Sequence, residues 1–274
     1  MIQGEPPQHA LRPVDTETPS VARMYDYYLG GRNNYDVDRA ACAELSAQVP
    51  STEILALNNR RFLRRVVHVL AAEYGVRQFI DHGSGLPTQD NVHEVAQRVH
   101  RDARVVYIDN DPIVLAHGRA LLKTDQNTDV IRADMRDTDY IFTHPSVQSL
   151  IDPSQPTAAL FVSVLHCIPD KDNPSGLVRH VAQRLGAGNF MVVCQLVSDD
   201  PSVRHWVSDF MRKSTGDNWG RVRERDEVDR YFDGMELLPP GRPTDVSKWR
   251  PEDLAPKQPS DEWIEYGGVA RILG

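Results

Sequence analysis

The chain has 274 residues and a mass of 30.9 kDa; 40% of its residues are hydrophobic, 26% are charged, and the formal net charge is −8 at pH 7. This length and balance predict a globular protein with a sizeable core and exclude a chain that is disordered, collagen-like or coiled-coil throughout. The negative charge disfavours nucleic acid as a partner.

Membrane, secreted and metal-binding proteins are also disfavoured. The longest apolar run, residues 158–165, is far shorter than the ~20 residues that span a bilayer, and the first residues lack the basic and apolar regions of a signal peptide. The three cysteines form no C-x-x-C pair, and the histidines show no metal-ligand spacing. We therefore expect a soluble, cytoplasmic protein without membrane contact or bound metal, and no pattern predicts its oligomeric state.

The first quarter of the chain has a helical pattern. Residues 1–18 are rich in Pro, Gln, Glu and Thr and predict a flexible tail. Helical spacing follows, with a break at residues 29–34, where Gly-Gly and Asn-Asn favour a turn. We predict a helical cap or lid over residues 19–74. The arginines of residues 60–65 occupy the polar side of an amphipathic helix, which indicates a solvated face or, alternatively, an anion or partner contact.

From residue 75 to residue 274, short apolar runs alternate with helical segments. The predicted strands are residues 78–81, 103–108, 130–133, 158–165 and 190–196, and the predicted helices between them are residues 91–99, 112–122 and one through 177–185. Further helices are expected near residues 203–211 and 227–232, with β-like pieces around 235–238 and 266–272. This alternation predicts an α/β fold, a mostly parallel sheet with helices on both faces.

Acidic residues and glycines follow the predicted strands. Asp81 ends the first strand and is followed by Gly83 and Gly85, while Asp109 and Asp134 end the second and third strands. The carboxyl ends of parallel strands line one crevice, in which such sheets bind ligands. Glycines let the backbone approach a ligand closely, and an acid after the second strand can accept hydrogen bonds from both ribose hydroxyls.

The glycine turn departs from the dinucleotide fingerprint G-x-G-x-x-G. The position three residues after Gly85 is Thr88, and Pro87 stiffens the turn. A missing third glycine and an acid after the third strand favour an adenosine ligand without a diphosphate. S-adenosylmethionine, with its cationic sulfonium and amino acid end, fits this pattern better than NAD. An NAD-linked oxidoreductase and a non-catalytic S-adenosylmethionine-binding protein remain the alternatives.

Several longer strings resemble one family. They are ARMYDYYLGGRNNY (22–35), DRA (38–40), NRRFL (59–63), DHGSGLPT (81–88), NVHE (91–94), VYIDNDP (106–112), VLH (164–166) and YGGVAR (266–271). Together they are similar to an actinobacterial S-adenosylmethionine-dependent methyltransferase family that was long catalogued as a domain of unknown function. The resemblance covers nearly the whole chain after residue 19.

This resemblance implies a fold and a set of site residues. The fold is that of class I methyltransferases: a Rossmann-like, seven-stranded sheet whose last pair includes an antiparallel strand. Gly83 and Gly85 are expected to face the cofactor, and the Gly-Gly segment to close over it as a lid. Asp109 is expected at the ribose, and Asp134 with Met135 at the adenine. The full set of expected cofactor-binding residues is Asp81, Gly83, Gly85, Asp109, Asn110, Asp134, Met135, Tyr28, Gly30 and Gly31. The replacement of the third glycine by Pro87 leaves the path of the methionine end open.

The chemistry predicted for the site is methyl transfer. The cofactor carries the reactivity, so the protein mainly orients the reactants and excludes water. His166, just past the fourth strand, is the candidate general base if the acceptor is a hydroxyl or a protonated amine. The alternative is a histidine with a structural hydrogen bond. We expect a small-molecule acceptor, whose identity the sequence does not reveal.

Overall fold

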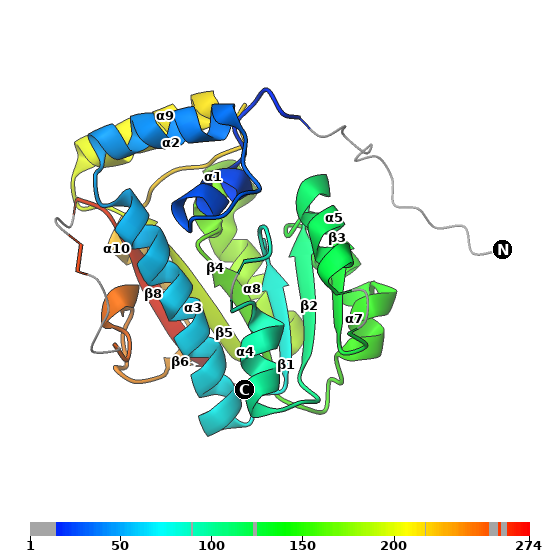
Figure 1. The fold of residues 1–274 in the computed structure, drawn as a ribbon. Coiled ribbons are helices and arrows are strands. Elements are labelled where there is room, and N and C mark those ends of the chain that lie inside the picture. The colour runs from blue at the N-terminus through cyan, green and yellow to red at the C-terminus, as the bar shows by residue number, and fades with distance from the viewer. Residues whose placement is uncertain (1–14, 89, 123–124, 217, 252–256, 259–261) are drawn as a thin grey trace.

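A central eight-stranded sheet organises the computed structural model, which describes residues 15–88, 90–122, 125–216, 218–251, 257–258 and 262–274 (Figure 1). Its strands are β1 (Gln78–His82), β2 (Arg104–Asp109), β3 (Thr128–Arg132), β4 (Thr157–Val162), β5 (Phe190–Val197), β6 (Met235–Leu237), β7 (Thr244–Asp245) and β8 (Ile264–Ile272). The order is β3-β2-β1-β4-β5-β8-β6, with β7 beside β8. Strands β1 to β5 pair in parallel, and β8 is antiparallel to β5, β6 and β7. The order reverses between β1 and β4, which is the point where such sheets bind ligands.

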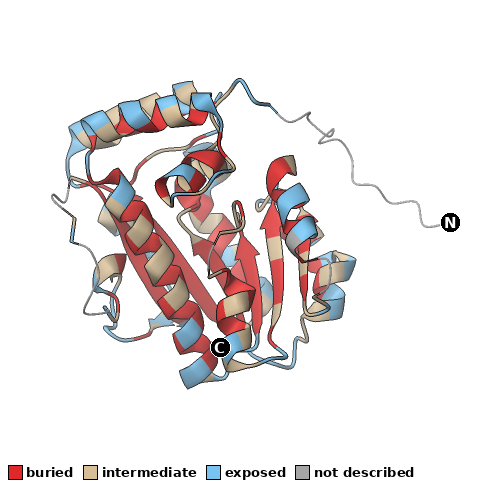
Figure 2. Cartoon of the chain, in the orientation of Figure 1, coloured by how far each residue is buried: buried red, intermediate tan, exposed pale blue. Residues whose placement is uncertain are grey.

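Helices cover both faces of the sheet, so the central strands are buried (Figure 2). On one face lie α3 (Thr52–Tyr74), α4 (Val92–Val99) and α5 (Pro112–Leu121). On the other face lie α6 (Thr138–Thr143), α7 (Pro145–Leu150), α8 (Pro174–Leu185) and α10 (Arg225–Asp229). The mostly apolar sequences of β4 and β5 are explained by this arrangement, because both of their faces are covered.

A third layer lies at the carboxyl ends of the strands. We call α1 (Val21–Tyr28), α2 (Asp36–Gln48) and α9 (Pro201–Ser214) the cap. Figure 1 shows α1 above the strand ends, with α2 and α9 beyond it. Ala22 of α1 packs with Leu86, Ile113 and Val114 beside the glycine turn, and other α1 side chains share a core with Leu196 of β5. Helix α1 therefore spans the strand ends from the β1–β2 side to the β5 side.

The structure confirms the predicted fold class and adjusts several elements. Strand β4 was expected to run to residue 165, but the chain turns at Ser163, whose φ is +58°, into a short 3₁₀ helix at Leu165–Cys167. The seven-stranded path of the predicted fold is present, and β7 is an additional two-residue strand. Helices α6 and α7 were not predicted. The predicted tail, residues 1–18, lies largely outside the described residues.

Helix α3 differs most from its prediction. It was assigned to the cap, but its apolar stripe packs on the sheet and shares a core with β1, β4 and β5. One of its arginines is not solvated: Arg65 is 7% exposed, and its guanidinium donates to the carbonyls of Trp249, at 3.0 Å, and Val246, at 2.7 Å. The polar side of this helix thus holds the C-terminal segment in place.

The part of the chain that the structure describes holds neither a membrane-crossing helix nor a cluster of metal-ligating side chains. None of its helices combines the length and the apolar character that crossing a membrane requires. In the same part of the chain, no three His, Cys, Asp or Glu side chains are grouped so that they could hold a metal ion.

Candidate active site

The glycine turn after β1 lies at the carboxyl ends of β1, β2 and β4, where sheets of this kind bind ligands, and we call the region around it the crevice. The amides of Gly83 and Ser84 both donate to the carbonyl of Ile108, at 2.8 and 3.1 Å. Gly83 has a φ of +69°, and a Cβ on it would lie 2.4 Å from Cγ2 of Val164 and 3.0 Å from Cε of Met135. Only a glycine fits here, because the turn packs directly against the side chains of Val164 and Met135.

Gly85 and Asp109 form the adjacent wall. A Cβ on Gly85, whose φ is +67°, would meet no atom of the protein within 4 Å. The Gly85 amide donates to Oδ2 of Asp109 at 2.8 Å, and the Asp111 amide donates to Oδ1 at 2.9 Å. Because a carboxylate oxygen accepts more than one hydrogen bond, Asp109 is fixed in place and can still accept from ribose hydroxyls. The open space beside Gly85 fits a ligand that approaches the backbone closely. Asn110, next to Asp109, is exposed.

Three carboxyl groups around the crevice are buried and have raised pKa values. Burial raises the pKa of Asp81 to about 7, with a contribution from the charge of Asp109, against the opposing effect of the Arg60 guanidinium. Burial likewise raises the pKa of Asp109 to about 6 and that of Glu265 to about 7. Bringing a positive charge among these groups would favour their ionised forms. The crevice therefore suits a cationic ligand.

Of the two residues predicted after β3, Asp134 and Met135, only Met135 lies against the glycine turn. Met135 reaches the crevice, as its closeness to Gly83 shows. The carboxylate of Asp134 instead pairs with Arg136, which in turn pairs with Asp172 at 2.6 Å. These carboxylates raise the pKa of Arg136. Asp134 thus holds the loop after β3 by an ion pair, and its carboxylate is engaged.

Two tyrosines of α1 make different contacts: Tyr28 with α2, and Tyr25 with α3. The Tyr28 hydroxyl donates to the Cys42 carbonyl of α2 at 3.0 Å, so its polar end is engaged inside the cap. The Tyr25 hydroxyl donates to the Ala56 carbonyl of α3 at 3.2 Å and accepts from Nδ2 of Asn59 at 2.9 Å. Contact of Tyr28 with the cofactor therefore stays a prediction.

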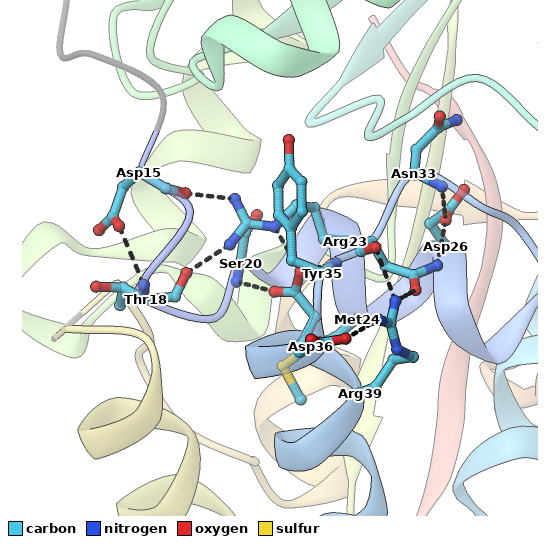
Figure 3. A network of polar contacts seen from close by, with 12 residues as sticks. Asp15, Thr18, Ser20, Arg23, Met24, Asp26, Asn33, Tyr35, Asp36 and Arg39 are labelled. Carbon is cyan, nitrogen blue, oxygen red and sulfur yellow. Dashed lines mark hydrogen bonds and ion pairs between the residues drawn. The ribbon is translucent and has the colours of Figure 1, made fainter.

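The Gly-Gly turn after α1 is held by a buried aspartate. Asp26 is 2% exposed, and its carboxylate accepts from the Asn33 amide and the Asn34 side chain, both at 2.8 Å (Figure 3). Gly31 lies directly on that carboxylate, and Gly30 has a φ of +74°. Both glycines thus serve the turn that joins α1 to α2, and movement of this segment as a lid stays a prediction.

A buried ion pair fixes α1 to α2. Nε of Arg23 lies 2.7 Å from Oδ2 of Asp38, and the two side chains are 3% and 0% exposed. The other nitrogens of Arg23 donate to the carbonyls of Asp15 and Thr18, which ties the preceding segment to the cap (Figure 3). Next to it, the Ser20 hydroxyl donates to Asp111 at 3.2 Å and links the cap to the β2 side of the crevice.

His166 is placed as a structural residue. It is 2% exposed, its Nδ1 accepts from the Leu196 amide at 3.4 Å, and its ring lies against Trp219 with centroids 4.5 Å apart. Burial and the nearby charge of Arg223 lower the pKa of His166 to about 3. Of the two interpretations that the sequence left open, this geometry favours the structural one.

A polar cluster that the sequence did not reveal adjoins the crevice. It consists of Tyr25, Asn59, Ser163, Cys194 and Glu265, which come from α1, α3, β5, β8 and the end of β4. The Ser163 hydroxyl donates to Glu265, and the Cys194 thiol donates to Asn59 at 3.3 Å. In the sequence, the one available signal for this cluster was Glu265, an acidic residue in the otherwise apolar and glycine-rich segment WIEYGG (263–268). This segment overlaps the string YGGVAR that resembles the family.

Comparisons with known proteins agree with this geometry. A family model described as S-adenosyl methyltransferase matches residues 7–273. No protein with a curated description matches the chain.

Solved structures give a consistent result. A candidate methyltransferase from Thermobifida fusca YX is 39% identical, with a TM-score of 0.85, over 95% of this chain and 97% of that chain. A DUF574 family protein from Streptomyces avermitilis MA-4680 is 34% identical, with a TM-score of 0.86, over 95% of this chain and 100% of that chain. An O-methyltransferase family protein from Burkholderia thailandensis, 12% identical with a TM-score of 0.50 over 82% of this chain and 58% of that chain, is similar in fold alone.

Proposed function

The chain belongs to the S-adenosyl methyltransferase family and uses S-adenosylmethionine, and from this premise we propose that it methylates a small-molecule acceptor. The observation that carries the proposal is the crevice beneath α1, in which buried acids and an open glycine turn lie under a helical cover. The membership confirms the family resemblance and the cofactor that the sequence predicted.

The residues present fit the cofactor. When bound, S-adenosylmethionine supplies a methyl group that is activated by the positive charge on its sulfur. We assign Asp109 to the ribose hydroxyls and Met135 to the adenine, with the backbone at Gly83 and Gly85 lying against the ligand. Asp81, buried beside Asp109, is suited to the ammonium group of the methionine end. The three buried acids disfavour a diphosphate, which argues against the NAD alternative.

A small acceptor is supported by the cover over the crevice. Helix α1 packs beside the glycine turn through Ala22 and shares a core with Leu196 on the β5 side. A long polymer would have to enter beneath this helix, whereas a small molecule can be enclosed by it. Enclosure also excludes water, which keeps the orientation of the reactants and protects the activated methyl group.

Labelled methyl transfer tests the proposal. S-adenosylmethionine carrying a labelled methyl group is incubated with the protein and a cell extract, which is then separated into small molecules, protein and nucleic acid. We expect label in the small-molecule fraction. Asp109→Ala should weaken cofactor affinity by ~10–100-fold, because it removes charge-assisted hydrogen bonds worth ~1.5–3 kcal/mol.

Asp139→Ala is the matched control, since the Asp139 side chain is 70% exposed on α6 and away from the crevice. It should behave like the unaltered protein in affinity and transfer. Label in the protein or nucleic acid fraction would contradict the proposed acceptor class, and an unchanged affinity in Asp109→Ala would contradict the assigned cofactor site.

The pH dependence of cofactor binding follows from the raised pKa values. In the free protein, Asp81 and Asp109 have pKa values of about 7 and about 6. A cationic ligand lowers both, so binding releases protons, and affinity for S-adenosylmethionine should fall as the pH decreases through 7 and 6. The expected slope is up to ~10-fold per pH unit for each proton released. Calorimetry between about pH 5.5 and about pH 8, in buffers of different ionisation enthalpy, measures affinity and proton release. A flat profile would show that these acids do not face the ligand.

A further inference from the structure

Glu265 is a buried acid that the cofactor assignment leaves without a role. It is 1% exposed in β8, and one carboxylate oxygen accepts the Ser163 hydroxyl. Within the described part of the chain, the other oxygen, Oε2, is buried and has no hydrogen-bond partner. A buried carboxylate oxygen without a partner is costly in free energy, so it indicates a site that a polar group of a ligand completes.

The position of Glu265 is set by the end of β4. Ser163, which holds its carboxylate, directly precedes Val164, the residue on which Gly83 rests. Ser163 adopts a φ of +58°, a conformation that non-glycine residues rarely take and that is often found at functional sites. The antiparallel pairing of β8 with β5 sets Glu265 opposite Leu196, at the same end of the sheet as the crevice.

Glu265 and Asp109 lie on opposite sides of the switch point. Asp109 ends β2, on one side of β1, whereas Glu265 lies beyond β4 and β5 on the other side. Both carboxylates act on the same thiol, because their charges add to burial in raising the pKa of Cys167 to about 12. A ligand whose ribose is held at Asp109 would reach Glu265 by running along the strand ends past β1, β4 and β5.

We propose that Oε2 of Glu265 faces the position of methyl transfer and accepts the proton of the acceptor, which makes the acceptor a hydroxyl or an amine. This inference rests on the proposed function. In the step, a bond forms from the acceptor oxygen or nitrogen to the methyl carbon while the carbon–sulfur bond breaks. The electron pair of the broken bond stays on sulfur, which becomes a neutral thioether, and the acceptor proton moves to Glu265.

In the described polar cluster, Glu265 is the residue whose pKa lies near neutrality. Cys194 of β5, Cys167 after β4 and Tyr25 of α1 all have pKa values raised by burial, so each stays protonated at neutral pH. Asn59 of α3 does not titrate. Burial raises the pKa of Glu265 to about 7, and the hydrogen bond from the Ser163 hydroxyl partly offsets that effect. A base with this pKa is suited to a reaction near neutral pH.

Binding of a charged analogue tests this position without any acceptor. In sinefungin, a carbon bearing an amine replaces the methylated sulfur, so an ammonium occupies the position of the methyl group. At about pH 8 the protein should bind sinefungin about 10-fold more tightly than S-adenosylhomocysteine, which lacks that charge. Glu265→Gln should abolish the preference and leave affinity for S-adenosylhomocysteine unchanged. Glu236→Gln, an exposed carboxylate on β6, is the matched control.

Ser163→Ala keeps the carboxylate and provides a second test. Loss of the hydroxyl removes a hydrogen bond that favours ionised Glu265, so the pH at which the sinefungin preference appears should move upward. Persistence of the preference in Glu265→Gln, its absence from the unaltered protein, or an unmoved midpoint in Ser163→Ala would each overturn the proposal. Failure of the unaltered protein to bind either analogue would instead contradict the proposed function.

Discussion

Asp38→Ala is expected to lower the free energy of unfolding by about 3–5 kcal/mol, which for a chain of this size lowers the melting temperature by roughly 10 °C. The carboxylate of Asp38 accepts from Nε of Arg23 at 2.7 Å, from the Ser20 amide at 2.9 Å and from the Tyr35 amide at 2.8 Å. Removing it leaves the positive charge of Arg23, 3% exposed, without its carboxylate partner. Two backbone donors lose an acceptor in the same change.

Asp36→Ala is the control for this substitution. Asp36 lies two residues earlier in the same helix and also pairs with an arginine, Arg39, but its side chain is 96% exposed. An exposed pair contributes only ~0–1 kcal/mol, so this variant should unfold close to the unaltered protein. Thermal and urea unfolding of both variants measure the difference. Equal stabilities would show that the Arg23–Asp38 pair does not hold the cap.

The cap has a functional consequence as well. The segment that Arg23 organises also places Ser20 on Asp111 and Ala22 beside the glycine turn. A cap that detaches more easily would expose the crevice to water. Destabilisation by Asp38→Ala should therefore be accompanied by weaker cofactor binding, whereas destabilisation elsewhere in the sheet need not be.

Much of the β1–β2 side of the site was predictable because it depends on local patterns. Alternating strands and helices imply a parallel sheet, and a parallel sheet brings the residues after its strands to one edge. This places Asp81, Gly83, Gly85 and Asp109 together without knowledge of any long-range contact. In the structure the Gly85 amide donates to Asp109, and the charge of Asp109 contributes to the raised pKa of Asp81.

The other side of the site depends on contacts between distant segments. Ser163 and Glu265 are 102 residues apart, and they meet because β8 pairs antiparallel with β5 in one register, which no local pattern specifies. Tyr25 and Tyr28 are three residues apart on one helix, so helical spacing does not separate their roles. In the structure Tyr28 bonds to the Cys42 carbonyl of α2, whereas Tyr25 bonds to Asn59 of α3.

Gly267→Ala is expected to lower the free energy of unfolding by more than about 4 kcal/mol. Losses of this size are exceptional for single substitutions and arise from severe overpacking, among other causes. A Cβ on Gly267 would lie 1.9 Å from the carbonyl oxygen of Val193 and 2.6 Å from Cα of Cys194. These are backbone atoms of β5 in the interior of the sheet, so relief would require β5 and β8 to separate. Because this pairing sets Glu265 beside Ser163, its loss would also dismantle the β5 side of the crevice.

The neighbouring glycine provides a demanding comparison. A Cβ on Gly268 would meet Cδ2 of Leu237 at 3.4 Å, an ordinary contact with the end of a side chain, so Gly268→Ala should cost far less. The two variants differ by one position in the same strand and add the same methyl group, so strand propensity does not separate them. Soluble yield and melting temperature measure the contrast. If both variants unfold alike, the close approach of β5 and β8 is not what requires glycine at residue 267. If only Gly267→Ala unfolds, that close approach is the reason for the glycine.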